Sequence, residues 1–189
     1  MLIDDHHYDF IIVGGGASGA TLAKQLSRKG KWVLLLERGG QLPTEDQNIR
    51  GADLFKKKRF HPMNENWLGP DGDPFAPQTV YALGGNTKIW GSVLQRMREE
   101  DFGDLKLQEG ISPAWPISYE EIEPYYELAE KMYKVHGKRG IDKTEPIRKS
   151  EYEQPPIQIE PIFKEIREVL IQEGCNPYYL PMSSPDEAK

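Results

Sequence analysis

The sequence predicts an α/β fold that begins with a strand, a helix and a second, parallel strand. A continuous apolar run over Phe10–Val13 is followed at once by a Gly-x-Gly-x-x-Gly motif at residues 14–19. Small or apolar residues then recur at helical spacing, and a second apolar run covers residues 32–36. Continuous apolar runs are typical of parallel strands that are covered on both faces. This order predicts a Rossmann-like βαβ unit whose first turn binds a pyrophosphate.

Each glycine of the motif has a separate physical role. Gly14 lets the chain turn sharply where the strand ends, and Gly16 lets a phosphate approach bare backbone. Gly19 lets the helix pack close to the strands, so that the unpaired amides of its first turn face the anion. The second apolar run ends on Glu37. A carboxylate there can accept hydrogen bonds from a ribose diol and would repel a 2′-phosphate, which favours FAD or NAD over NADP.

Composition and charge exclude several functional classes. The chain has 189 residues and a formal net charge of −6, which argues against nucleic acid as the main partner. The basic run at residues 56–59 is typical of a solvated face. No segment approaches the about 20 apolar residues that a membrane span needs, and the acidic N-terminus does not resemble a signal peptide. With Cys175 as its single cysteine, the chain is expected to be cytoplasmic.

The middle of the chain is less regular. Residues 41–77 are rich in Pro, Gly, Asp and Asn, and they are predicted to form a long excursion with one helical stretch near residues 52–58. Residues 79–83 have the pattern of a short strand. Residues 86–97 are predicted to be helical at the start, with Asn86 or Thr87 as the cap.

Two helices are predicted in the last third of the chain. Ser118 and Glu121 form an S-x-x-E capping pattern at the start of the first. Pro124 is predicted to end or kink the first turns of this helix. The second helix covers residues 160–173, and Gly174 closes it.

Two further segments carry a family resemblance. They are YALGGNTKIWGSVLQRMREEDF at residues 81–102 and WPISYEEIEPYYELAEKMYKVHG at residues 115–137. Together with the glycine motif, they make the chain resemble the N-terminal half of a glucose–methanol–choline oxidoreductase, over nearly its whole length. The resemblance implies a Rossmann-like FAD-binding domain, truncated, with appended helices from the start of the second half-domain.

The resemblance also implies a function. Members of this family bind FAD and oxidise an alcohol carbon of sugars, choline or related alcohols by hydride transfer to the flavin. The chain is therefore expected to be the FAD-binding portion of such an enzyme. Two alternatives remain: a non-catalytic FAD- or NAD-binding module or subunit fragment that needs a second chain, and a NAD-binding dehydrogenase domain of another class.

The matching positions define the expected cofactor site, and no metal site is expected. The cofactor-binding residues implied by the resemblance are Gly14, Gly16, Ala17, Ser18, Gly19, Glu37, Arg38, Gly84, Gly85, Asn86 and Thr87. Some relatives carry a histidine just before the tryptophan of the second glycine segment, and that histidine bonds covalently to the flavin. Here Ile89 precedes Trp90, and Lys88 cannot replace an imidazole, so the FAD is expected to be non-covalent.

No catalytic residue is expected in this chain. Family members run several hundred residues, and their substrate domain and catalytic histidine lie in the later half. Proton abstraction needs a positioned base, and none of the four histidines matches the family's catalytic position. These histidines are His6, His7, His61 and His136. The expected partners are a small-molecule alcohol in the complete enzyme and a second chain that supplies the missing half.

The expected domain organisation follows the motifs. Residues 1–136 are predicted to form the FAD-binding region, with a βαβ core at 8–39 and a flavin-proximal segment at 79–102. Residues 137–156 are polar and contain proline, and they are predicted to be a linker. Residues 157–189 are expected to begin an incomplete following region.

Overall fold

The computed structural model of the chain describes residues 6–42, 65–76 and 79–184. The expected helical stretch at residues 52–58, the basic run at 56–59 and His61 lie outside the described residues. The contacts divide the chain into two compact units, residues 1–90 and residues 91–189. This division falls inside the expected flavin-proximal segment at 79–102, and the expected domain boundaries stay a prediction.

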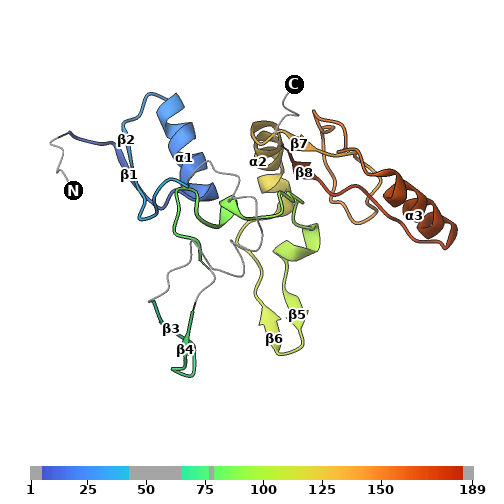
Figure 1. The fold of residues 1–189 in the computed structure, drawn as a ribbon, viewed down its shortest axis with the longest axis horizontal. Coiled ribbons are helices and arrows are strands. Elements are labelled where there is room, and N and C mark those ends of the chain that lie inside the picture. Colours follow the sequence, from blue (N-terminus) through green and yellow to red (C-terminus); the bar gives the residue numbers. More distant parts are fainter. Residues whose placement is uncertain (1–5, 43–64, 77–78, 185–189) are drawn as a thin grey trace. The chain divides into compact units, whose positions relative to one another are not determined.

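The first unit contains the predicted βαβ arrangement. Strand β1 spans Phe10–Val13, helix α1 spans Ala17–Arg28, and strand β2 spans Val33–Leu36 (Figure 1). The two strands pair in parallel, with Phe10 opposite Val33 and Val13 opposite Leu36. The α/β fold predicted from the apolar runs and the glycine motif is therefore confirmed.

Two smaller features complete the first unit. Strands β3, Trp67–Leu68, and β4, Pro74–Phe75, form a short antiparallel ribbon. The segment that follows departs from the prediction, because residues 79–83 form no strand and make a single bridge, from Ala82 to Gly40. After it comes a single 3-10 turn, η3, at Gly85–Lys88.

The second unit contains two helices and short strands. A 3-10 turn, η4, spans Glu99–Phe102; strands β5, Leu105–Leu107, and β6, Gly110–Ser112, form a hairpin; and α2 spans Tyr119–Met132. Strand β7, Val135–His136, pairs with β8, Met182–Ser183, and α3 spans Pro161–Gln172.

Helix α2 corrects one prediction and confirms another. The capping box between Ser118 and Glu121 is present, as predicted. Pro124 lies inside the helix and does not end it, because α2 runs from Tyr119 to Met132. A proline lacks one amide hydrogen and forfeits one helical bond. Before Pro124 the helix is held by the capping box and by the buried side chains of Tyr119 and Glu123, and after it by Glu130, which accepts from Arg96 and Arg148.

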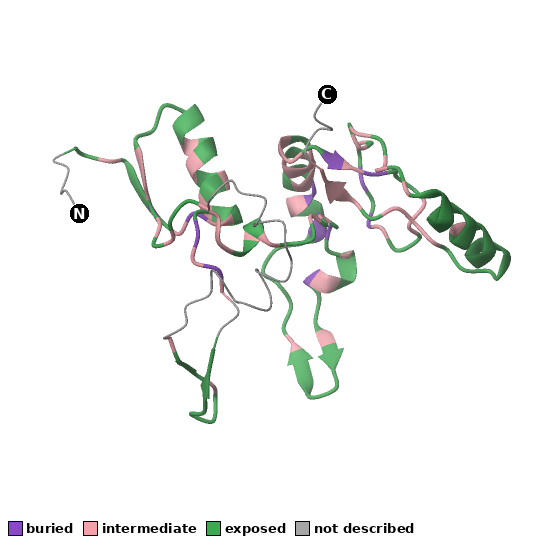
Figure 2. Cartoon of the chain, viewed as in Figure 1, coloured by how far each residue is buried: buried purple, intermediate pink, exposed green. Residues whose placement is uncertain are grey.

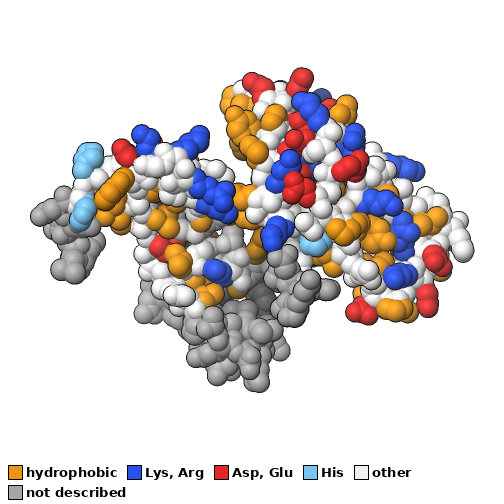
Figure 3. Space-filling view, turned by 90° about the horizontal axis from the view of Figure 1, so that it is seen from above, with side chains coloured by type: hydrophobic (Ala, Val, Ile, Leu, Met, Phe, Trp, Pro, Cys, Tyr) orange, Lys and Arg blue, Asp and Glu red, His pale blue; other side chains and the backbone are white. Residues whose placement is uncertain are grey.

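The core of each unit is small. Figure 2 shows few buried residues, and these lie on short stretches of the ribbon. In the first unit Ile12, Val80 and Ala82 are buried, whereas Val13 on β1 is 82% exposed. Figure 3 shows hydrophobic side chains on the surface of both parts of the chain. A two-stranded parallel sheet leaves apolar side chains open in this way, since parallel strands are normally covered on both faces.

Residues 137–156, the expected linker, contribute a buried side chain to the second unit. Arg148 is 2% exposed, and its guanidinium donates to Glu130 of α2 and to Glu145. Arg96, which is 4% exposed, donates through two nitrogens to the same Glu130 carboxylate at 2.8 Å each. The second unit is therefore organised around a buried network of ion pairs.

Candidate dinucleotide-binding site

The glycine turn after β1 has the geometry that its sequence predicts. Gly14 has a φ of +96°, a conformation that other residues rarely adopt, and its amide donates to the Leu36 carbonyl of β2 at 2.8 Å. A Cβ atom at Gly19 would lie 2.0 Å from the Gly14 carbonyl oxygen. The first turn of α1 therefore packs directly against the end of β1, and this packing requires glycine at position 19.

Among the described residues, Ala17 and Ser18 at the N-terminus of α1 are exposed. Gly16 is the N-cap residue, no described side chain accepts a hydrogen bond from this end, and the first turn contains no acidic residue. The first amides of a helix have no partner within the helix, and the helix dipole adds positive charge at this end. The backbone of Ala17, Ser18 and Gly19 therefore offers donors to an anion such as a diphosphate.

Glu37 connects the turn to the end of β2. Its Oε2 atom accepts a hydrogen bond from the Gly15 amide at 2.7 Å, and its Oε1 atom accepts one from the Gly39 amide at 2.8 Å. The bonds from Gly39 and Gly15 hold the pKa of the Glu37 carboxyl below its ordinary value of 4.5. The side chain is thus charged at neutral pH. Each carboxylate oxygen accepts more than one hydrogen bond, so a ribose hydroxyl can still donate to it.

The second glycine segment lies against this turn. A Cβ atom at Gly39 would lie 2.2 Å from the Ala82 amide nitrogen, and the Leu83 amide donates to the Gly40 carbonyl at 2.9 Å. A Cβ atom at Gly16 would lie 4.0 Å from the Gly84 carbonyl oxygen. The structure therefore brings the two glycine segments together, although they are far apart in the sequence.

The turn at Gly84 is shaped by its own side chains. Gly84 and Gly85 have φ values of +100° and +56°. The Oδ1 atom of Asn86 accepts from the Val80 amide at 2.8 Å, and the Thr87 hydroxyl donates to the Gly84 carbonyl. Neither side chain caps η3 in the predicted manner, since Gly84 is the N-cap residue. Asn86 and Thr87 instead fix the path of bare backbone beside the first turn.

Arg38 makes contacts that the sequence did not reveal. Its guanidinium lies 3.3 Å from the centroid of the Tyr81 ring, and it forms an ion pair with Glu65 at 3.5 Å. The Tyr81 hydroxyl also donates to Glu65. Burial and this bond raise the pKa of Tyr81 from its ordinary value of 10.0. Arg38, the residue after Glu37, thus contacts Tyr81 of the second glycine segment.

Three functional positions were missed by sequence reasoning. Gly15 is buried, and a Cβ there would lie 3.1 Å from Glu37 Oε2, so this glycine is needed for the carboxylate to reach the turn. Gly39 and Tyr81 position the second segment. The run of three glycines at 14–16 could have indicated Gly15, but the partners of Gly39 and Tyr81 follow from the tertiary fold.

None of the described histidines is among the residues that make these contacts. His6 stacks on Trp32 with ring centroids 5.9 Å apart, and the Nδ1 atom of His136 lies 2.8 Å from the Pro155 carbonyl oxygen. Within the described ranges, no group of His, Cys, Asp or Glu side chains could hold a metal ion. The helices of that part of the chain are too short or too polar to cross a membrane.

The arrangement is suited to a dinucleotide. It combines an open helix end for a diphosphate, a carboxylate for a ribose, and a second stretch of bare backbone that a flat ring system can approach closely. Its components are backbone amides, one acidic side chain and glycines. Such a site binds and orients a cofactor, and the cofactor supplies the reactive atoms.

Comparisons with known proteins agree with this geometry. The NAD(P)-binding Rossmann-like domain matches residues 12–54. Paromamine 6'-oxidase of Streptomyces fradiae is 32% identical over 136 residues, which cover 71% of this chain and 24% of that protein. Glucose dehydrogenase [FAD, quinone] of Drosophila pseudoobscura pseudoobscura is 29% identical over 173 residues, which cover 80% of this chain and 25% of that protein.

A solved structure shows the same fold. An FAD-dependent oxidoreductase from Chaetomium thermophilum superposes with a TM-score of 0.51 at 22% identity, over 94% of this chain and 31% of that chain. The chain spans about a quarter of the length of the curated relatives it matches.

Proposed function

Since the chain belongs to the glucose–methanol–choline oxidoreductases and corresponds to their N-terminal portion, we propose that it holds FAD for the oxidation of an alcohol. The proposed substrates carry a CH–OH group, as sugars, choline-type alcohols and related compounds do. When bound, FAD would supply the acceptor for the hydride that leaves the alcohol carbon. The residues of this chain bind the cofactor and orient it.

The observation that carries the proposal is the open N-terminus of α1 beside the second glycine segment. A diphosphate would lie against the amides of Ala17, Ser18 and Gly19, where no described side chain competes for them. Bare backbone at Gly16 and Gly84 supports close approach of a ligand, and the two glycines are near each other, since a Cβ at Gly16 would lie 4.0 Å from the Gly84 carbonyl oxygen.

The remaining expected residues have matching roles in the proposal. Glu37 accepts hydrogen bonds from the adenosine ribose, and Arg38 keeps the segment around Tyr81 in place through its ring contact. Gly85, Asn86 and Thr87 hold the second backbone stretch in the shape that faces the flavin. The negative charge of Glu37 disfavours a 2′-phosphate, which supports FAD over NADP.

We further propose that the FAD is bound without a covalent bond. Ile89 stands before Trp90 and offers no nucleophile, and Lys88 packs its side chain next to Gly84. Acid precipitation of the flavin-loaded protein should release the yellow cofactor into the supernatant. Colour retained in the pellet would contradict this part of the proposal.

In this proposal, the substrate pocket and the catalytic base are supplied by residues other than those of this chain. The base takes the hydroxyl proton as the hydride leaves, and it must lie within hydrogen-bond reach of that hydroxyl. We propose that a second chain contributes both where this chain is a separate subunit. Purified chain loaded with FAD should then show no bleaching with alcohols, and bleaching by choline or glucose would contradict the assignment.

A ligand series tests the cofactor site directly. FAD should bind the purified chain at least about tenfold more tightly than FMN, because FMN lacks the diphosphate bridge and adenosine. NADH carries both, and it should bind more weakly than FAD because it has no flavin ring to lie against the bare backbone of the second glycine segment. ADP, which carries the diphosphate and ribose, should displace FAD in competition. The measurement is quenching of flavin fluorescence at equilibrium. Failure of FAD to bind, or FAD binding that ADP does not reduce, would contradict the proposal. Tighter binding of NADH than of FAD would favour a nicotinamide-binding module.

A cytoplasmic location is also part of the proposal. Cys175 is a free and exposed thiol, a state that fits a reducing compartment. Fractionation of cells that express the tagged protein should place it with cytoplasmic markers, and recovery from an oxidising compartment would contradict the proposal.

A further inference from the structure

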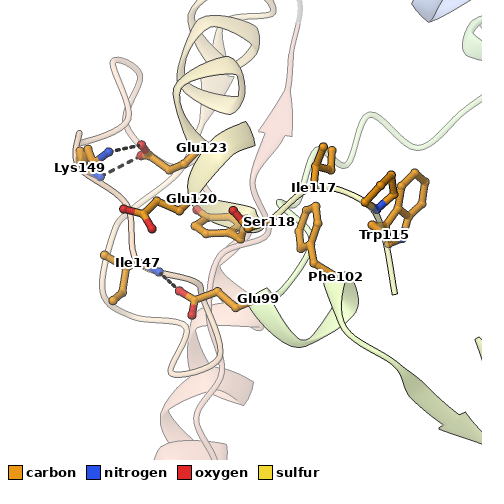
Figure 4. A pocket seen from close by; sticks show the side chains of 11 residues that line it. Glu99, Phe102, Trp115, Ile117, Ser118, Glu120, Glu123, Ile147 and Lys149 are labelled. Carbon is orange, nitrogen blue, oxygen red and sulfur yellow. Dashed lines mark hydrogen bonds and ion pairs between the residues drawn. The ribbon is translucent and has the colours of Figure 1, made fainter. Parts of the chain in front are cut away.

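The second unit contains a cavity that the proposed cofactor site does not use. The cavity has a volume of about 800 Å³, and all of its lining residues lie between Glu99 and Lys149. It opens at the start of α2, next to η4 and the segment around Ile147 (Figure 4). This volume lies within the range of small-molecule pockets.

One wall of the cavity is aromatic and apolar. Figure 4 shows Phe102, Trp115 and Ile117 together on one side. Phe102 is 7% exposed, and its ring meets Tyr119 edge to face with centroids 6.1 Å apart, so this part of the wall is fixed. Trp115 is 55% exposed, which leaves its indole available to a ligand. Aromatic faces attract cations as well as apolar groups.

The opposite wall is acidic. Glu99, Glu120 and Glu123 lie on the side away from Trp115 in Figure 4. Glu123 is 3% exposed and is neutralised by two cations. The Lys149 backbone amide donates a hydrogen bond to its Oε1 atom at 3.1 Å, the Lys149 ammonium lies 3.3 Å from its Oε2 atom, and the Arg96 guanidinium lies 3.4 Å from Oε1. Glu99 accepts a bond from the Ile147 amide at 3.4 Å. No described basic side chain pairs with Glu99 or Glu120, so these two carboxylates leave the cavity with negative charge.

The start of α2 does not reverse this charge. A helix N-terminus attracts anions through its free amides. Here Ser118 accepts from the Glu121 amide, and Glu120 and Glu121 add negative charge in the first turn. The helix end is already satisfied, and the cavity therefore disfavours an anionic ligand.

We propose that this cavity binds a small organic cation with a flat apolar body, such as an aromatic amidine or amine. The apolar body lies against Trp115 and Phe102, and the cationic group faces Glu99 and Glu120. Apolar contact and charge complementarity thus act on the two ends of one ligand. The lining residues all belong to the second unit, and none of them is among the residues proposed to hold FAD.

Benzamidine and benzamide are a matched pair of probes for this proposal. They have the same shape, but benzamidine is a cation and benzamide is neutral. Benzamidine should bind the purified chain with a dissociation constant on the order of 1 mM, as expected for so small a ligand. It should shift the indole N–H signal of Trp115 in a nitrogen-15 NMR spectrum, with the signal assigned by its loss in Trp115→Phe. Benzamide should bind at least about tenfold more weakly.

Charge variants complete the test. The double variant Glu99→Gln, Glu120→Gln should weaken benzamidine binding about tenfold and leave benzamide binding unchanged. Both side chains are exposed, so the variant is expected to fold. Glu165→Gln, an exposed change on α3, should leave both probes unaffected. Equal binding of the two probes, no indole shift at 20-fold excess over the expected constant, or full benzamidine binding by the double variant would overturn the proposal.

Discussion

The N-termini of α1 and α2 differ in whether side chains pair with their first backbone amides. At α2 the Ser118 hydroxyl accepts from the Glu121 amide at 3.2 Å, and the Glu121 carboxylate accepts from the Ser118 amide at 2.8 Å. At α1 the cap is Gly16, and no side chain in the described part of the chain serves that end. An orphan helix end needs a partner. The contrast supports the proposal that the start of α1 binds a ligand, whereas the start of α2 is capped by its own side chains.

The two units also differ in what holds them together. In the first, glycines let backbone approach backbone, as Gly39 does with Ala82. In the second, buried charges add to a small apolar core, since Arg96 and Arg148 both donate to Glu130. Close backbone contact leaves no side chains between segments and so keeps a surface for a flat ligand. In the second unit, ion pairs between side chains fix α2 against the 140s segment.

The largest expected effect is on the buried network of the second unit. Glu130→Gln removes the carboxylate that two buried arginines share, and it should lower the free energy of unfolding by about 3–5 kcal/mol. Glu153→Gln is the matched control. Its partner Lys131 lies 3.7 Å away on the surface, so the loss should stay below about 1 kcal/mol. Urea unfolding followed by circular dichroism measures both, and equal losses would show that burial of the network does not matter.

The next largest effect is on FAD binding, when a substitution gives α1 the side-chain cap that it lacks. Gly16→Asp places a carboxylate where the diphosphate is proposed to bind, and it should weaken FAD binding at least about 100-fold by repulsion and competition. The stability of the chain without cofactor should stay level or rise by up to about 1 kcal/mol, because Asp is a good cap. Flavin titration and thermal unfolding measure the two quantities. A variant that still binds FAD normally would break the contrast between the helix ends.

Two adjacent glycines provide a sharper test of close backbone contact. Gly39→Ala forces a methyl group to 2.2 Å from the Ala82 amide nitrogen, whereas Gly40→Ala meets no atom within 4 Å. The first change should destabilise the first unit by about 1–3 kcal/mol, and the second should stay within about 0.5 kcal/mol. Chemical denaturation of both variants measures this difference. Indistinguishable midpoints would mean that the 79–84 segment is not held against β2.

The smallest effect concerns the capped helix. Ser118→Ala removes the hydroxyl that accepts from Glu121, and it should cost about 1 kcal/mol of stability. FAD affinity should not change, because the helix end of α2 has no part in the cofactor site. Denaturant unfolding and flavin titration on one sample measure both. A loss of flavin affinity without a loss of stability would contradict the purely structural role of the α2 N-terminus.

Local sequence patterns predicted the elements whose causes are local. The apolar runs gave β1 and β2, the glycine motif gave the turn into α1, and the Ser118 pattern gave the start of α2. Pro124 does not end the helix, one of the two outcomes predicted for it, because its lost hydrogen bond is a local cost, whereas the contacts that hold α2 come from Arg96 and the 140s segment. Tertiary contacts outweighed the local preference.

The sequence predicted the glycines of the candidate site, but it did not predict the hydrogen bonds and packing that hold Glu37 and the second glycine segment in place. Gly14 and Gly19 follow from the spacing of the motif, since each has a steric role within a few residues. Glu37 was expected to face a ribose, but its bond to Gly15 joins residues 22 positions apart, and no spacing rule predicts that bond. The expected strand at 79–83 is absent because one bridge to Gly40 and the close packing at Gly39 hold this segment.

Amide chemical shifts on addition of FAD test the central claim most directly. In a nitrogen-15 NMR titration of the isotope-labelled chain, the amides of Ala17, Ser18 and Gly19 should shift most, together with those of Gly84 and Gly85. The Glu120 and Glu121 amides at the start of α2 should remain unchanged. Shifts concentrated at α2, or an unperturbed α1 terminus at saturating FAD, would contradict the account.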